Sequence, residues 1–139
     1  MAKTFEDLSV FRAATELMTE VYRITESFPR HEMYGLVAQM RRASVSVVSN
    51  IAEGQGRLTL GEWRQLLSNA RGSLYELEAQ LIASHRLGFL DDVAYRRARR
   101  FTFAVGTLLG GFIRYVRTRE AAVQKRKSTG NRQQATGNN

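Results

Sequence analysis

The sequence predicts an all-α protein, with four helices packed up-down-up-down in a single bundle. In four segments, apolar residues recur at the three-and-four spacing of one helix face, and no segment shows convincing strand alternation. The links between these segments are only a few residues long, which favours antiparallel neighbours. With 139 residues, the chain can form one hydrophobic core without disulfide or metal support.

The first predicted helix runs from about Leu8 to Ser27. Leu17 and Thr25 flank its apolar face. That face consists of residues at helical spacing, namely Phe11, Ala14, Met18, Val21 and Ile24. We expect the helix to stop at Phe28-Pro29, because proline biases the residue before it away from helical geometry.

The second predicted helix runs from Tyr34 to Glu53. We expect Gly54 and Gly56 to end it, since glycine readily adopts the left-handed conformation found at helix C-termini. Its apolar face consists of Leu36, Met40, Ser44, Val47 and Ile51. A polar stripe lies beside that face and consists of Gln39, Arg42, Ser46, Asn50, Glu53 and Arg57.

The remaining arc of this helix has small and apolar residues where a surface helix normally has Lys or Glu. We call it the outer arc, and it consists of Ala38, Val45, Ser49 and Ala52. Ten successive residues, Ala43–Ala52, carry no charge. A helix without an ordinary solvated face is buried on several sides. We therefore predict that the outer arc contacts another subunit of a homo-oligomer.

The third and fourth helices have clear start signals. Thr59 opens a capping box in which Glu62 reaches back, and we expect this helix to end at Gly88. Its apolar stripe is Trp63, Leu67, Ala70, Leu74, Leu77 and Leu81. The fourth helix is predicted to start after Asp91 and Asp92, whose carboxylates suit a helix N-terminus. The residues expected to face inward are Ala98, Phe101, Val105, Leu108, Phe112 and Val116.

Positive charge is concentrated at the C-terminal end. The net charge of the chain is +8, and residues 117–139 contribute +5 of it through six Lys or Arg and one Glu. The last stretch is polar, rich in Gly and Asn and without apolar periodicity, which is typical of disorder. We therefore predict a bundle domain at residues 1–118 and a basic, disordered tail at residues 119–139.

Composition also bears on the compartment. The chain has no cysteine, no signal-peptide pattern and no run of the roughly 20 apolar residues that span a bilayer. These features predict a cytoplasmic protein that does not associate with membranes.

Short motifs between Phe5 and Gly88 carry a family resemblance, and Asn50-Ile51-Ala52-Glu53-Gly54 is the most specific of them. The others are Phe5-Glu6-Asp7-Leu8, Tyr22, Phe28-Pro29, Tyr34-Gly35-Leu36, Gln39, Arg41-Arg42-Ala43, Ser46, Arg57, Gly72-Ser73, Glu76-Leu77 and Leu87-Gly88. In these residues the chain resembles the four-helix-bundle proteins encoded in intervening sequences of bacterial large-subunit ribosomal RNA genes. That superfamily includes the accessory protein of diversity-generating retroelements.

The resemblance implies a bundle that assembles into a cylindrical ring of five subunits. The retroelement relative is thought to work with RNA and a reverse transcriptase, so the resemblance implies these as partners. This chain departs from the family in two places. Val48 stands where relatives often have proline, and the region after Val116 has no recognisable counterpart.

Reactive groups suited to catalysis are sparse. His31 lies in a predicted link and His85 near the end of the third helix, and no Glu has a His three residues later, as di-iron bundles require. The chain lacks a Gly-Lys-Ser/Thr phosphate loop and a Gly-x-Ser-x-Gly nucleophile elbow. We expect a protein that is not an enzyme and uses no metal or cofactor.

The polar stripe of the second helix is predicted to meet a similar stripe on the third. The residues expected in this structural network are Gln39, Arg42, Ser46, Asn50, Glu53, Ser73 and Glu76. Paired polar groups between helices fix register and assembly geometry. The alternative is that Glu53 and Glu76 act as an acid and a base. We favour the structural interpretation because no nucleophile or metal ligand accompanies them.

The best candidate for binding is a basic face on the fourth helix and the tail. Its residues are Arg96, Arg99, Arg100, Phe103, Arg114, Arg117, Lys125, Arg126 and Lys127. Arginine pairs with phosphates, and an exposed aromatic ring stacks on bases. The alternative is a solvated basic face on which Phe103 closes a subunit contact.

Together these features predict a homo-oligomer that binds nucleic acid, RNA rather than DNA. The competing hypothesis is a protein-interaction scaffold, for example a reverse transcriptase accessory partner, whose arginines meet acidic protein surfaces.

Overall fold

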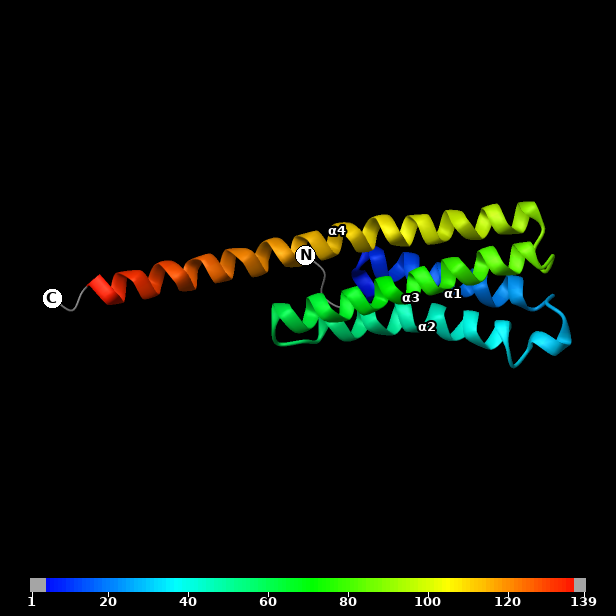
Figure 1. Cartoon of the computed structure of the whole chain (residues 1–139), viewed down its shortest axis with the longest axis horizontal. Helices are drawn as coiled ribbons and strands as arrows, with labels where there is room; N and C mark the ends of the chain where they lie inside the picture. Colours follow the sequence, from blue (N-terminus) through cyan, green and yellow to red (C-terminus); the bar gives the residue numbers. More distant parts are fainter. Residues whose placement is uncertain (1–4, 137–139) are drawn as a thin grey trace.

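The computed structural model describes residues 5–136, which form helices and no strand (Figure 1). The four α-helices are α1 (Ser9–Thr25), α2 (Leu36–Gln55), α3 (Leu60–Arg86) and α4 (Asp92–Thr136). Two short 3-10 helices, η1 (Phe5–Asp7) and η2 (Arg30–Glu32), precede α1 and α2. The predicted all-α class and the predicted number of α-helices are confirmed.

Consecutive helices run antiparallel and lie side by side (Figure 1). Helix α1 packs against α2 and α4, and α3 packs against the same two helices. Helices α2 and α4 make no close backbone approach within residues 5–136, so they lie diagonally across the bundle. No helix in this range is both long enough and apolar enough to cross a membrane.

The helix boundaries follow from local capping. The Thr59 hydroxyl accepts a hydrogen bond from the Glu62 backbone N–H at 3.1 Å and caps the first turn of α3, which confirms the Thr59 half of the predicted capping box. The Asp91 carboxylate accepts one from the Ala94 N–H at 2.8 Å at the start of α4. Gly88 closes α3 with a φ of +80°, which glycine adopts without a Cβ penalty.

The core is one continuous seam between the four helices. Each helix contributes residues that have lost essentially all contact with solvent, among them Leu17, Val21, Met40, Val47, Ile51, Leu67, Leu74, Leu77, Leu81, Val105, Leu109 and Ile113. Fully burying a side chain of this size stabilises the fold by roughly 1.5–3 kcal/mol. The seam therefore supplies most of the stability of the bundle.

The structure corrects the inward face predicted for α4. Leu108 was expected in the core but is 39% exposed, whereas its neighbour Leu109 is buried together with Ile113. Phe101 and Phe112 are half-buried at the edge of the core rather than at its centre. The buried face of α4 is rotated from the predicted one because α4 packs against α1 and α3 at once. The spacing of apolar residues does not specify how a helix is rotated about its axis between two neighbours.

Helix α1 shows a smaller shift of the same kind. Val10 and Leu17 are buried at its centre, while Phe11 and Met18, which were placed in the middle of the apolar face, are half-buried at its edge.

The C-terminal segment also differs from the prediction. Where disorder was expected from residue 119, α4 continues as a helix to Thr136 and extends beyond the ends of the other three helices (Figure 1). The physical reason is composition, because Ala, Gln, Lys and Arg are strong helix formers and the segment has no proline. We call residues 121–136 the arm; its described side chains, at 121–135, are exposed.

Gly54 has a role that differs from the predicted one. It does not adopt a left-handed conformation but lies buried inside α2. A Cβ added at this position would lie 2.9 Å from Cδ1 of Trp63 on α3. Gly54 therefore permits the close approach of α2 and α3, which explains why a glycine follows Asn50–Glu53 in the family motif.

This close approach generates a first prediction. Gly54→Ala should lower the free energy of unfolding by about 1 kcal/mol or more, because overpacking against Trp63 outweighs the gain in helix propensity. Gly72→Ala is the matched control. A Cβ at Gly72 in α3 meets nothing within 4 Å, so that change should stabilise the fold by about 0.5–1 kcal/mol. Urea denaturation of both variants checks the prediction, and a stabilising Gly54→Ala would contradict it.

Candidate nucleic-acid interface

The outer face of α4 carries the exposed arginines predicted from the sequence. Phe103 projects from this face with 77% of its surface exposed. The predicted arginines that are exposed on the same helix are Arg96 and Arg100 before Phe103 and, three to four turns further along, Arg114 and Arg117. The side chains of Arg100, Arg114 and Arg117 have no ion pair or hydrogen bond within residues 5–136, so their donors are available to a ligand.

Arg99 differs from the other predicted arginines. It is turned toward α3, where its guanidinium lies 4.0 Å from the Glu78 carboxylate and 5.9 Å from the centre of the Tyr95 ring. These contacts hold it against the bundle. Arg99 therefore lies at the margin of the basic face rather than within it.

The start of α4 is fixed to the end of α3. Nε2 of His85 lies 2.6 Å from Oδ1 of Asp92, and the His85 ring stacks on Tyr95 with centroids 4.3 Å apart. The hydrogen bond and charge of His85 lower the pKa of the Asp92 carboxyl. These contacts fix the position of the first turn of α4, where the basic face begins.

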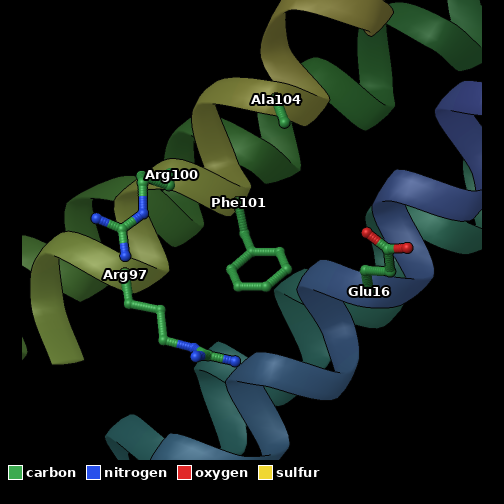
Figure 2. A pocket seen from close by; sticks show the side chains of 5 residues that line it. All are labelled: Glu16, Arg97, Arg100, Phe101 and Ala104. Atoms are coloured by element: carbon green, nitrogen blue, oxygen red, sulfur yellow. The ribbon is translucent and has the colours of Figure 1, made fainter.

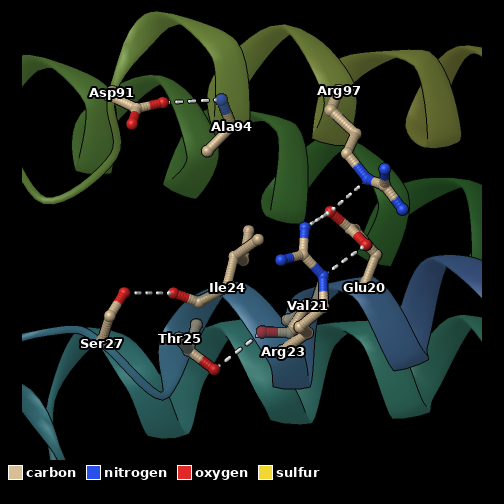
Figure 3. A network of polar contacts seen from close by, with 9 residues as sticks. All are labelled: Glu20, Val21, Arg23, Ile24, Thr25, Ser27, Asp91, Ala94 and Arg97. Carbon is tan, nitrogen blue, oxygen red and sulfur yellow. Dashed lines mark hydrogen bonds and ion pairs between the residues drawn. The ribbon is translucent and has the colours of Figure 1, made fainter.

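A buried carboxylate, which the sequence reasoning missed, joins α4 to α1. Glu20 of α1 is only 4% exposed, and Figure 3 shows Arg23 and Arg97 converging on it. Arg23 donates to both carboxylate oxygens, at 2.5 and 3.1 Å, and Nε of Arg97 donates to Oε1 at 3.1 Å. The available signal was a glutamate among the apolar positions Leu17, Val21 and Ile24.

The charge state of Glu20 follows from these contacts. Burial alone raises the pKa of its carboxyl, but the hydrogen bonds and charges of Arg23 and Arg97 outweigh burial, and the pKa lies below its ordinary value. Glu20 is therefore ionised at neutral pH and holds Arg97 in place on α4.

Next to this ion pair, a cavity of about 370 Å³ opens between α1 and α4. We call it the α1–α4 pocket, and it is lined by Glu16, Arg97, Arg100, Phe101 and Ala104. Figure 2 shows the Phe101 ring between the two helices, with Glu16 opposite it on α1 and the arginines on its other side. The guanidinium carbon of Arg97 lies 5.8 Å from the centre of the Phe101 ring.

The arm extends the basic surface away from the bundle. Lys125, Arg126 and Lys127 are exposed. Just before them, the Glu120 carboxylate accepts a hydrogen bond from Nε of Arg64 on α3 at 2.8 Å, which ties α4 to α3. Because Arg64 neutralises this carboxylate, the basic residues beyond it meet little opposing charge.

Part of the predicted polar network is present, within α2 and between α2 and α3. The Ser46 and Ser73 hydroxyl oxygens are 2.8 Å apart, and Arg42 lies 3.8 Å from the Glu76 carboxylate. Asn50 donates from Nδ2 to the Ser46 carbonyl at 2.8 Å and to its hydroxyl at 3.1 Å. Gln39 is exposed.

The two carboxylates of the alternative acid–base pair have separate partners. Glu53 pairs with Arg57, which lies just beyond the C-terminal end of α2, and Glu76 accepts from Nε2 of Gln80 at 3.1 Å. Within the described residues, no group of three or more His, Asp or Glu side chains gathers as metal ligands would.

Most of the outer arc of α2 is exposed in the part of the chain that the structure describes. Val45 is 37% exposed, Ala38 and Ser49 are also exposed, and Ala52 is half-buried. The arc thus remains available to a second subunit.

Comparison with known proteins identifies similar sequences and folds. The family model described as "23S rRNA-intervening sequence protein" matches residues 6–111. A crystal structure from Bacteroides thetaiotaomicron, described as a protein with unknown function from the S23 ribosomal protein family, superimposes with a TM-score of 0.70 at 17% identity. The match covers 76% of this chain and 95% of that one, and at this identity it supports the fold alone. A comparison with curated proteins gives no match.

The Glu20 ion pair generates a second prediction. Glu20→Gln should lower stability at neutral pH by about 1.5–3 kcal/mol, the range for hydrogen bonds to charged groups. The folded pKa lies below the ordinary value of 4.5. The contribution of Glu20 is therefore fully present above that pH and is lost as the pH falls through the folded pKa.

Thermal or urea unfolding of both proteins across a pH series measures this difference. The difference in stability between the unmutated protein and Glu20→Gln should stay constant near neutral pH and become smaller at acidic pH. Glu26→Gln, at an exposed position just after α1, should change the stability little at any pH. A gap that widens on acidification would contradict the assignment.

Proposed function

The chain belongs to the family of 23S rRNA-intervening sequence proteins, and from that premise we propose that it is a homo-oligomer that binds RNA through α4 and catalyses no reaction. The observation that carries the proposal is the charge pattern of α4. Between Asp92 and Glu120 the helix has seven arginines and no acidic residue. A surface with charges of one sign only attracts polyanions, and this helix has more positive charge than it needs to be solvated.

The position of Phe103 supports RNA over duplex DNA. An exposed aromatic ring flanked by arginines can stack on an unpaired base while the guanidiniums pair with phosphates. Double-stranded DNA does not offer unstacked bases, whereas RNA loops and bulges do. The arm adds phosphate contacts beyond the bundle, because Lys125, Arg126 and Lys127 follow the basic face along the same helix.

The outer arc of α2 supports the homo-oligomer. Small uncharged residues let another helix approach closely, and within residues 5–136 Val45 remains 37% exposed. A ring of five, as the family resemblance suggests, would present several basic faces to one RNA molecule. Several linked contacts raise the apparent affinity through effective concentration.

A protein-binding scaffold is the second candidate, and one observation favours it. Leu108 and Tyr115 are exposed on α4, so a protein partner would find apolar contacts on the helix that carries the arginines. Nuclease treatment separates the two functions. An association that survives nuclease supports the scaffold, and one that nuclease abolishes supports RNA binding.

A third prediction tests RNA binding through its dependence on salt. The logarithm of affinity should fall linearly with the logarithm of salt concentration, by about 0.7 per phosphate contact on single strands. Arg96→Ala combined with Arg114→Ala, and separately deletion of residues 125–139, should flatten this slope without unfolding the bundle. Binding isotherms over a salt series on a structured RNA give the slopes.

The matched control removes two charges on the other side of the molecule. Arg30→Ala combined with Arg57→Ala removes the same number of positive charges as Arg96→Ala combined with Arg114→Ala. The two control positions precede and follow α2, which lies diagonally across the bundle from α4. This control should leave the slope nearly unchanged. Equal affinity for structured RNA, duplex DNA and an unrelated polyanion would contradict a preference for RNA.

A fourth prediction concerns assembly. Val45→Glu should dissociate the oligomer, since an unpaired charge buried in an interface costs several kcal/mol. Ala122→Glu adds the same charge on the exposed arm and should leave assembly intact. Light scattering measures the mass of each species. An unmutated protein that is monomeric at micromolar concentration would rule out the proposed interface.

A further inference from the structure

The α1–α4 pocket contains charged groups that the basic face alone does not explain. Glu16 and Arg100 line the same cavity, yet neither side chain has an ion pair or hydrogen bond within residues 5–136. They lie beside the half-buried ring of Phe101 (Figure 2). We propose that this pocket binds one unpaired guanine nucleotide, an inference that rests on the proposed RNA binding and names the base that RNA would present.

The wall of the pocket suits a flat aromatic ligand. Phe101 presents part of its ring to the cavity, and the Arg97 guanidinium lies 5.8 Å from the ring centre. Bases stack on both aromatic rings and guanidinium planes. Arg97 is pre-organised for this role, because the buried Glu20 carboxylate already holds its Nε at 3.1 Å.

The two unpaired charges match the two ends of a nucleotide. An ionised carboxylate accepts hydrogen bonds and donates none. Glu16 therefore selects a base edge with donors, and guanine presents two adjacent ones, N1–H and the N2 amino group. Arg100 is exposed at the rim, where its guanidinium can pair with the phosphate.

The pocket is open to solvent and large enough to hold a small molecule or a single residue of a polymer. Its volume of about 370 Å³ is near the lower end of the range for small-molecule sites. Ala104 forms part of the lining and is exposed, so a larger side chain there would fill the cavity without disturbing the core. A base-paired guanine cannot enter, because its donor edge is already engaged.

The experiment compares short oligouridines with and without one central guanosine, together with free GMP, by fluorescence anisotropy and competition. Guanosine should tighten binding of the oligouridine by about tenfold, as expected for one bidentate contact to a base edge. Inosine, which lacks the N2 amino group, should lose much of that gain. Displacement by GMP at a concentration comparable to that of the oligonucleotide shows that a free nucleotide suffices. Displacement only by the oligonucleotide shows that the guanine must be part of RNA.

Two variants test the pocket directly. Glu16→Gln should abolish the preference for guanosine while the oligouridine still binds, and Ala104→Leu should reduce the guanosine oligonucleotide to the affinity of oligouridine. Ala83→Leu, which adds the same bulk at an exposed site on α3, should change neither value. Circular dichroism and melting curves verify the fold of each variant.

The outcomes separate this inference from the proposed function. If the unmutated protein did not bind RNA at all, both the proposed function and the guanine site would be wrong. Tight RNA binding without a preference for guanosine, or with a preference that survives Glu16→Gln and Ala104→Leu, would overturn the pocket and leave the basic face intact. Photo-crosslinks from 6-thioguanosine to the peptide containing Phe101 would support the pocket, and crosslinks confined to the arm would contradict it.

Discussion

Four helices bury one apolar stripe each against a shared seam, and this packing determines which surfaces of the chain remain exposed. Leu17, Met40, Leu77 and Leu109 are completely buried at the centre of the seam, one from each helix. A helix with one apolar stripe needs only that stripe for its place in the bundle. Its opposite face contributes little to folding of the single chain and is available for binding.

The outer faces of α2 and α4 differ in composition. On α2 the face is small and uncharged around Val45, whereas on α4 it is rich in arginine around Phe103. The two helices lie diagonally across the bundle, so a subunit contact on α2 does not cover the basic face of α4. The Glu20 ion pair joins α1 to α4 and places Arg97 at the α1–α4 pocket.

The sequence predicted the parts of the fold that depend on local chemistry, namely the helix type, the Thr59 cap and the stop at Gly88. It failed where the answer depends on tertiary packing. Leu108 and Leu109 are equally apolar neighbours, and only the joint position of α1 and α3 decides which of them is buried. The same holds for Gly54, whose role depends on Trp63 of another helix.

In the candidate site, the exposed arginines could be predicted from helical spacing. The α1–α4 pocket could not, because its residues are separated by up to 88 positions in the sequence.

The central claim is that RNA contacts the arginines on the outer face of α4. The most direct measurement is chemical modification of arginines by a dicarbonyl reagent, with and without bound RNA, read out residue by residue by mass spectrometry. The account predicts that RNA slows modification of Arg96, Arg100 and Arg114 and leaves Arg30 unchanged. Protection of Arg30 with continued reactivity of the α4 arginines would contradict it.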